Sequence, residues 1–188
     1  ENINLPFQAG DDEVLKTMRR GYTNKEYRDL VKKIRDTVPN ISLSTDLIVG
    51  FCDESDMQFG ETLKLIEDIK FDKVHSASYS TRKGTIADRK MIDNVPEEVK
   101  KERLDLINNT QEKIVTKINK QLLGSKTEIL IEGKKEERWY GRNHFAICYS
   151  SFSCIVFLDD KNDIIPGTTV TVKIEKSSPW YMEGSIIK

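Results

Sequence analysis

Three clusters of polar and charged residues in the first half of the chain are suited to binding a ligand. Each cluster follows a run of residues that predicts a β-strand, and ligands of α/β proteins gather at the carboxyl ends of parallel strands. The clusters are Gln8-Ala9-Gly10 with Arg19-Arg20, Asp46 with Gly50-Phe51-Cys52-Asp53-Glu54, and Ser80-Thr81-Arg82-Lys83-Gly84-Thr85.

Each cluster also has a purely structural interpretation. Gln8 and Gly10 can form a strand-to-helix turn, Glu54 can belong to a helix cap, and Arg82-Lys83-Gly84 can be a solvated turn. Asp46 fits this interpretation less well, because it stands in an otherwise apolar strand and an unpaired buried carboxylate is costly. We therefore expect Asp46 to have a partner, such as a neighbouring Arg, or a ligand.

The elements that position these clusters alternate between strand and helix. Capping boxes at Thr23–Glu26 and Ser55–Gln58 open two of the predicted helices. The order is that of parallel βαβ units with right-handed crossovers. Three parallel strands cannot close a barrel, and both faces of a parallel sheet need cover, so we expect further strands on the N-terminal side. The predicted strands are residues 2–7, 41–49 and 71–79, with a short helix at 12–19 and a loop at 81–95.

A second domain is predicted where the apolar period changes from the helical value to two. A helix from residue 96 to about 122 precedes the change, with one apolar side, and Gly124 ends it. The five short strands that follow predict a small antiparallel, OB-like barrel. The domains are then 1–121 and 122–188. The apolar side carries Val99, Leu106, Ile107, Thr110, Ile114 and Ile118, and the strands are 127–132, 139–148, 154–157, 169–175 and 184–187.

Composition and charge indicate a cytoplasmic globular protein. No apolar run approaches the ~18–20 residues of a membrane span, and no secretion signal opens the chain. We expect a part of a longer protein, because the chain begins at Glu1 rather than Met. The net charge of −1 gives no general attraction to nucleic acid, so RNA binding would need a local basic patch.

The three cysteines do not form a cluster motif. Their odd number, without a secretion signal, favours reduced thiols. Cys148 and Cys154 with His144 could form part of a metal site, but ordinary half-buried strand thiols are the simpler interpretation. We expect no metal ligand and no catalytic residue in this chain. Cys52 is the third cysteine.

One barrel strand has a composition suited to unpaired RNA. Alternation with period two places Tyr140, Arg142 and His144 on one face and Trp139 on the other. Aromatic and Arg side chains on an exposed face can stack on bases. The simpler interpretation is that Trp139 and Phe145 fill the barrel core, which still leaves the other three side chains outside.

Six segments, in order, resemble the radical S-adenosylmethionine (SAM) methylthiotransferase family. They are NLPFQAGDDEVLKTMRRGYT, STDLIVGF, YSTRKGTIA, VPEEVKKERL and the barrel segments LLGSKTEILIEG and GTTVTVKIEK, the last two being similar to the family's TRAM domain. The resemblance covers nearly the whole chain. It departs at Asn4, where the family usually has His, and at Ala9, Asp11, Cys52, Asp53 and Ser55.

The resemblance implies the C-terminal portion of a tRNA-modifying radical SAM enzyme. The fold would be α/β: part of a TIM-like barrel of parallel strands, with a linker helix, followed by the TRAM barrel. Family members use SAM and two 4Fe–4S clusters to add a methylthio group to C2 of a modified adenosine at position 37 of tRNA, in the anticodon loop. The cluster ligands lie in family segments that are not present in this chain, which alone would be inactive.

The resemblance also implies roles for residues of the clusters. Gln8 and Arg20 match SAM-contacting residues, and a guanidinium suits the SAM carboxylate as a bidentate partner. Asp46 matches an acid that accepts from ribose hydroxyls. The backbone of Val49-Gly50-Phe51 matches an adenine-contacting segment, where Gly lets a flat ring approach.

Two other functions remain open on the sequence. One branch of the family methylthiolates a ribosomal protein instead of tRNA, and the neutral charge of the barrel favours neither substrate. A non-catalytic RNA-binding module is the alternative from a different class. The sequence gives no indication of the oligomeric state.

Overall fold

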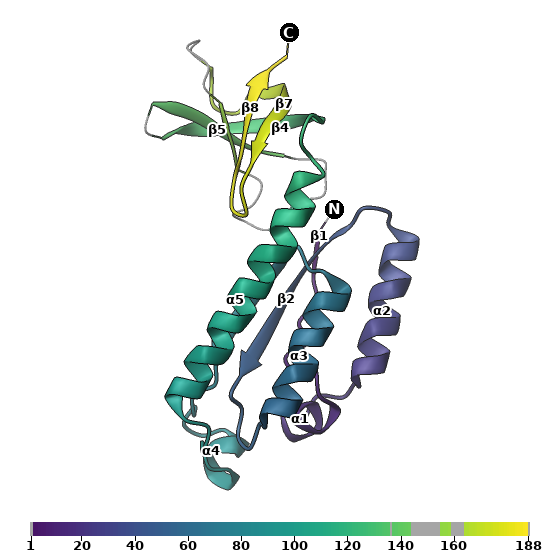
Figure 1. The fold of residues 1–188 in the computed structure, drawn as a ribbon, viewed down its shortest axis with the longest axis vertical. Coiled ribbons are helices and arrows are strands. Elements are labelled where there is room, and N and C mark those ends of the chain that lie inside the picture. Colours follow the sequence, from purple (N-terminus) through teal and green to yellow (C-terminus); the bar gives the residue numbers. More distant parts are fainter. Residues whose placement is uncertain (1, 136, 144–154, 159–163, 188) are drawn as a thin grey trace.

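The computed structural model describes residues 2–135, 137–143, 155–158 and 164–187 (Figure 1). It has an α/β part and a β-barrel, which the long helix α5 (Glu97–Lys120) connects. Among these described residues, no helix combines the length and the apolar character that crossing a membrane requires.

The α/β part is built on three parallel strands in the order β1-β2-β3, as the βαβ pattern predicts. β1 (Asn2–Asn4) is shorter than the predicted strand because the ladder is interrupted after Leu5. Pro6 has no N–H to donate, and the N–H of Phe7 donates to the Thr45 hydroxyl at 3.1 Å. Gln8 then rejoins the sheet through a bridge to Leu47. The other strands are β2 (Ser42–Val49) and β3 (Lys73–Ser78).

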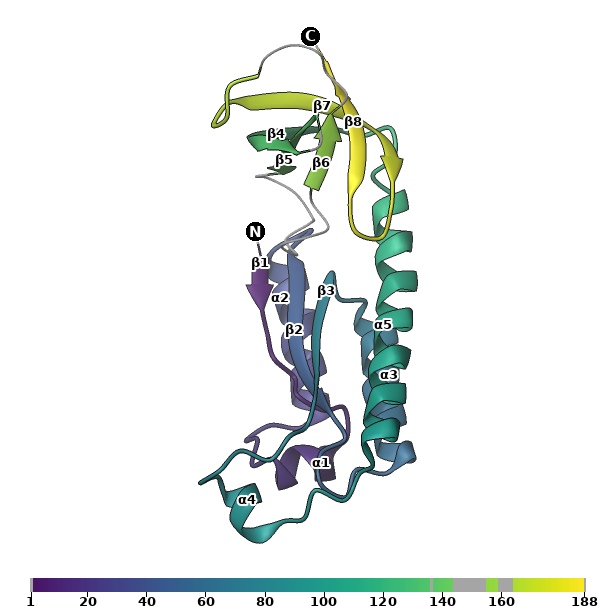
Figure 2. The ribbon, with the colours of Figure 1, turned by 90° about the vertical axis from the view of Figure 1, so that its left-hand side faces the viewer.

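Three helices cover one face of this sheet, as Figure 2 shows: α2 (Asn24–Thr37), α3 (Asp56–Ile69) and α5. Both predicted capping boxes are formed, at Thr23/Glu26 and Ser55/Gln58. Burying each large apolar side chain stabilises the fold by ~1.5–3 kcal/mol. The shared core includes Phe7, Tyr27, Val31, Leu43, Leu47, Val49, Leu65, Ile66, Phe71 and Ile107.

The opposite face of the sheet carries both polar and apolar side chains, and none of the described helices covers it (Figure 2). Register places Asp46 opposite His75 and Ile48 opposite Ala77 on that face. The sheet is therefore open on the side that would face the interior if further strands curled it into a barrel.

Two expectations about the helices are wrong. Residues 81–95 are not all loop, because Thr85 caps a short helix, α4 (Ile86–Lys90), by accepting from the Asp88 N–H. Leu106 of α5 was expected on the apolar side but is 49% exposed. The buried stripe of α5 instead includes Lys100 and Arg103, which a search for apolar periodicity cannot detect.

The second part is a closed five-strand barrel, as predicted, and its strand order is β4-β5-β6-β8-β7. The expected all-antiparallel arrangement is wrong for one pair, since β6 and β8 run parallel and place Val156 opposite Met182. The chain closes the barrel by inserting the last strand between the third and the fourth, which requires one parallel neighbour. The strands are β4 (Lys126–Lys135), β5 (Arg138–Asn143), β6 (Ile155–Leu158), β7 (Thr169–Ser177) and β8 (Met182–Ile186).

A buried polar contact joins α5 to the barrel. The side-chain amide of Asn119 is fully buried and donates to the carbonyls of Ser178, at 2.8 Å, and Pro179, at 3.3 Å. Nearby, the Lys73 ammonium lies 5.4 Å from the centre of the Trp180 ring. The barrel therefore lies toward the amino ends of the sheet strands, at the far end of α5 (Figure 1).

Candidate functional site

A cavity of about 500 Å³ lies at the carboxyl ends of the sheet strands, where the sequence places its three clusters. This volume is within the range of small-molecule sites. Apolar side chains of Ile48, Phe51 and Met91 meet polar groups of Gln8 and Arg20 in its walls. The remaining lining residues are Thr17, Met18, Arg19, Ala77, Ser78, Tyr79, Ser80, Arg82, Thr85, Ile86 and Ala87.

Gln8 is held in the cavity wall by a strained backbone. Its φ is +69°, a left-handed conformation that a residue with a Cβ adopts at a cost of ~1–3 kcal/mol. Two strand-like hydrogen bonds fix it, from the Gln8 N–H to the Asp46 carbonyl at 3.0 Å and from the Ile48 N–H to the Gln8 carbonyl at 2.9 Å. Strain held this firmly beside a cavity is consistent with a functional position.

Gly10 brings the following turn close to α3. Its N–H donates to the Thr62 hydroxyl at 2.9 Å, and a Cβ at this position would lie 2.5 Å from the Glu61 backbone. The structural interpretation of Gly10 is therefore correct. The turn leads into α1 (Asp12–Thr17), which Asp11 caps by accepting from the N–H groups of Glu13 and Val14.

The end of α1 places two arginines at the cavity. The N–H of Arg20 donates to the Leu15 carbonyl at 2.8 Å, and the N–H of Arg19 donates to the Lys16 carbonyl at 2.9 Å. Arg19 has a left-handed backbone, with φ +60°. Both side chains are exposed and line the cavity. A guanidinium here can bind an anionic group that enters from solvent.

The loop after β2 is shaped by a buried carboxylate. Glu54 Oε2 accepts from the Gly50 N–H at 2.6 Å and from Arg103 Nη1 at 2.8 Å. Burial raises the pKa of Glu54, and the hydrogen bonds from Gly50 and Arg103 oppose this shift without cancelling it. The loop carries Phe51, whose ring packs edge-on against Tyr79 with centroids 4.8 Å apart.

Lys100 supports the same loop from α5. Its side chain is 1% exposed, and its stem occupies the space beside Gly50 where a Cβ would lie 2.3 Å from Cγ. The ammonium is 2.8 Å from carboxylate oxygens of Asp93 and Glu97. Burial alone would lower the pKa of Lys100, but the hydrogen bonds to both carboxylates outweigh it and raise the pKa.

The structure brings only some of the predicted SAM-contacting residues to the cavity. Gln8, Arg20 and Phe51 line it, whereas Val49 is fully buried in the core and Gly50 is buried beneath its loop. Asp46 lies on the open face of β2, where its carboxylate accepts from the Asn4 side-chain amide at 2.7 Å. Asp46 therefore has a partner, as expected, but this partner is the Asn4 amide, and no Arg pairs with Asp46 among the described residues.

Several cavity residues were not selected from the sequence. Arg82 and Thr85 belong to the third cluster, which was noted but not assigned a role. Tyr79 and Met91 had no chemical signal of their own. Only position could have indicated them: Tyr79 directly follows β3 and opens a family motif, and Met91 directly follows α4.

The predicted alternation of side chains along β5 is present as far as the described residues reach, while an RNA-binding role for its outer face stays a prediction. Tyr140 and Arg142 point outward and Trp139 is buried, as predicted, while His144 and Phe145 lie outside the described residues. The Tyr140 ring is 6.4 Å from Phe157, which is 5.7 Å from Tyr181. The sequence analysis did not identify this aromatic row, because cross-strand neighbours depend on register.

No metal site is formed by the described residues, since no three His, Cys, Asp or Glu side chains among them are grouped to hold an ion. Cys52 is a buried free thiol. Cys148 and Cys154 lie outside the described residues, so the expectation about them stays a prediction.

Comparisons with known proteins give a consistent result. Residues 1–66 match the family model of the radical SAM superfamily. The chain is 43% identical over 187 residues to the tRNA-2-methylthio-N(6)-dimethylallyladenosine synthase of Dehalococcoides mccartyi strain CBDB1, covering 99% of this chain and 43% of that protein. Proteins of the same name from Roseiflexus sp. strain RS-1 and Anoxybacillus flavithermus strain WK1 are 42% and 40% identical, over 100% of this chain and 38% and 34% of their own lengths. The chain thus spans less than half of each of these relatives.

Proposed function

Because the chain belongs to the radical SAM methylthiotransferase family, we propose that it is part of an enzyme that adds a methylthio group to C2 of a modified adenosine in the tRNA anticodon loop. The observation that carries this proposal is the match of almost the entire chain to proteins named as tRNA methylthiotransferases. That naming favours tRNA over a ribosomal protein as the substrate. We propose a cytoplasmic location, which suits an enzyme that acts on tRNA.

The architecture supports the same proposal. The open parallel sheet would be one segment of a TIM-like barrel, with its open face directed at the barrel interior. The closed five-strand barrel would be the OB-like TRAM domain, the part that holds RNA. We propose that the catalytic iron–sulfur clusters, two in the parent enzyme, are ligated outside the described residues.

The cavity fits SAM in size and in chemistry. Its 500 Å³ volume and its apolar Phe51, Ile48 and Met91 walls suit an adenosyl group, while Arg20 suits the methionine carboxylate. Bound SAM would supply both the methyl group and, with a reduced cluster, the radical. This chain would orient SAM through Gln8 and Arg20 and exclude water with Phe51.

The other predicted contacts require backbone or open-face groups. Asp46 lies on the interior face of the sheet, so it can accept from ribose hydroxyls only if the ligand extends from the cavity along β2. The backbone of Val49 and Gly50 would act as the adenine-contacting segment, with Gly50 positioned by Glu54. These roles remain proposals for the intact enzyme.

The proposal is tested with the full-length gene in a bacterium that lacks its own tRNA methylthiotransferase. Mass spectrometry of nucleosides from total tRNA should detect the 2-methylthio product. Arg20→Ala should reduce its amount strongly, whereas Lys33→Ala, an exposed cation of α2, should not. Unmodified tRNA together with a methylthiolated ribosomal protein would show that the other branch of the family is correct.

A further inference from the structure

Two chain segments at the mouth of the cavity concentrate positive charge. One follows α1 and the other contains α4. Residues 18–21 and 80–91, which form these segments, together carry six basic residues and one acidic residue, Asp88, a local charge of +5 in a chain whose net charge is −1. All six basic side chains are exposed. They are Arg19, Arg20, Arg82, Lys83, Arg89 and Lys90.

These cations are not neutralised by neighbours. In the part of the chain that the structure describes, none of the six forms an ion pair, although Lys and Arg residues elsewhere do so repeatedly. The Asp88 carboxylate is itself engaged, because it accepts from the Gly84 N–H at 2.8 Å. The positive potential at this edge is therefore directed into solvent.

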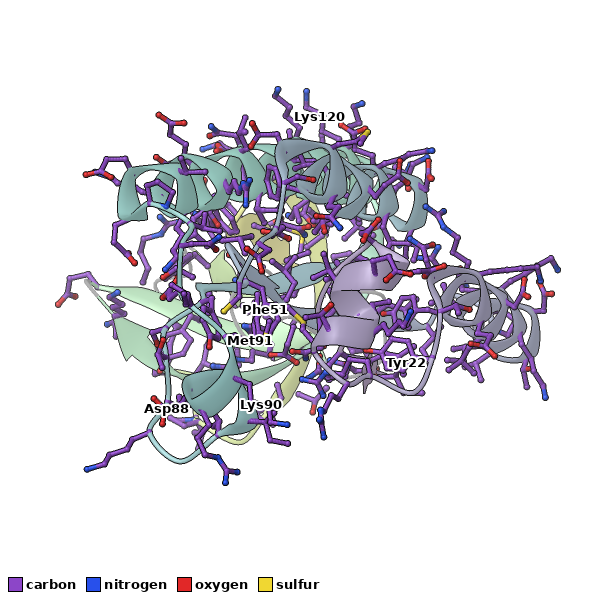
Figure 3. The ribbon with its side chains drawn as sticks, turned by 90° about the horizontal axis from the view of Figure 1, so that it is seen from below. Tyr22, Phe51, Asp88, Lys90, Met91 and Lys120 are labelled. Atoms are coloured by element: carbon purple, nitrogen blue, oxygen red, sulfur yellow. The ribbon has the colours of Figure 1, made fainter. Side chains whose placement is uncertain are left out.

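The α4 segment is anchored so that its basic residues face outward. Met91 and Ala87 pack against the buried cluster of Phe51 and Cys52. In Figure 3, Met91 lies beside Phe51 toward the middle of the molecule, while Asp88 and Lys90 lie at its outer edge. The segment thus has an apolar inner side and a cationic outer side next to the cavity opening.

We propose that Arg19, Arg82, Lys83, Arg89 and Lys90, here called the basic rim, bind the phosphate backbone of the RNA whose target nucleotide reaches bound SAM at the mouth of the cavity. This inference rests on the proposed function and adds a docking site for the substrate. A base reaches a cavity only when it leaves the stack, and the phosphates on both sides of it then lie at the opening. Arg20 is not included, because it has the SAM carboxylate as its proposed partner.

Phosphates are the ligand that this arrangement favours. Several flexible, exposed cations around an opening give charge attraction without a fixed orientation, which suits a run of phosphates. Arg19 and Arg82 line the cavity itself and would contact the nearest phosphates, while Lys83, Arg89 and Lys90 would contact the flanking ones.

The test measures binding of a fluorescein-labelled anticodon stem-loop RNA to the chain by anisotropy across a potassium chloride series. Arg82→Gln/Lys83→Gln should weaken binding about tenfold at low salt and reduce the log–log salt slope by about one per residue. Lys113→Gln/Lys117→Gln removes the same charge from exposed positions of α5 and should change neither. In Figure 3, α5, marked by Lys120, lies on the side opposite Lys90.

Three results would overturn the inference. The rim variant could bind RNA as the wild type does, or the wild-type chain could bind no stem-loop at low salt. The rim could also bind poly-glutamate while RNA fails to displace it, which would assign an acidic protein to it. Normal tRNA methylthiolation by the full-length enzyme alongside any of these would leave the proposed function intact. Thermal unfolding checks that the rim variant keeps the wild-type fold.

Discussion

Arg103 of α5 donates from Nη1 to Oε2 of Glu54 at 2.8 Å, and the two side chains are only 5% and 1% exposed. Arg103 also donates from Nη2 to the Glu54 carbonyl at 3.1 Å and to Asp56 at 2.8 Å. The linker helix is thereby fastened to the loop that carries Phe51. The shape of the cavity consequently depends on a helix that does not line it.

Removing one member of this pair should destabilise the α/β part. Arg103→Met leaves the Glu54 carboxylate buried without its cation, which should lower the free energy of unfolding by ~3–5 kcal/mol. Glu54→Gln combined with Arg103→Met should recover much of that loss, since neither member of the pair then carries a charge. Urea unfolding followed by far-UV circular dichroism measures both, with the exposed Lys101→Met as the control. A loss no larger than that of the control would show that the pair is unimportant.

Gly50→Ala should also be destabilising, by ~1–3 kcal/mol. The backbone has φ +69°, and the new methyl group would collide with the Lys100 stem. Gly60→Ala is the matched control, because no atom lies within 4 Å of its Cβ position inside α3 and the helix should gain up to ~1 kcal/mol. Thermal unfolding compares the two, and equal stability would contradict the steric argument.

The sequence predicted those features that depend on local side-chain and backbone chemistry. Both capping boxes, the parallel direction of the three sheet strands and the five barrel strands were identified in this way. Polar residues buried by distant partners were not, and Lys100 and Arg103 are the clearest cases. The contact between Asn4 and Asp46 joins positions on two strands and depends on register, which local patterns do not determine.

The candidate site was predictable to a similar extent. Gln8, Arg20 and Phe51 were selected and do line the cavity. Arg82 was placed in the third cluster at the carboxyl end of a strand, with a solvated turn as the alternative, and was given no role of its own. Sequence spacing located the strand ends, whereas the packing of α4 decided which following residues meet there.

The barrel should lose stability in acid through Glu183. Hydrogen bonds from Lys176 and Arg138 lower the pKa of Glu183 below its ordinary 4.5. A lowered folded-state pKa stabilises the fold above the unfolded-state pKa, and this contribution disappears as the pH falls through the folded-state value. Glu183→Gln should therefore cost ~0.5–1 kcal/mol at neutral pH and progressively less below about pH 4.

Tryptophan fluorescence isolates this effect, because both tryptophans, Trp139 and Trp180, belong to the barrel part. Urea titrations at several pH values give the free energy of unfolding for the wild type and the variant. The exposed Glu128→Gln is the control and should match the wild type throughout. A difference for Glu183→Gln that stays constant into acid would exclude the pKa argument.

Arg142→Ala in the full-length enzyme should weaken tRNA binding and reduce the log–log salt slope by about one. Arg142 is half-exposed, and its Nε lies 3.3 Å from Glu132. Glu132→Gln should therefore strengthen tRNA binding, because it releases Arg142 for a phosphate. Gel-shift titrations across a salt series measure both variants. Unchanged affinity in each would mean that this face of the barrel is ordinary solvated surface.

Helix α5 separates the two regions that would hold RNA. Its 24 residues correspond to a length of about 36 Å, and the helix runs from the α/β part to the barrel (Figure 1). Lys100 lies in its first turn, and Asn119 lies in its last turn, where it contacts the barrel. An RNA attached at one end is held at a high effective concentration near the other, so two weak attachments reinforce each other. Only a molecule long enough to reach both gains this avidity. The length of the helix would thus favour binding of folded RNA over short fragments or free nucleosides.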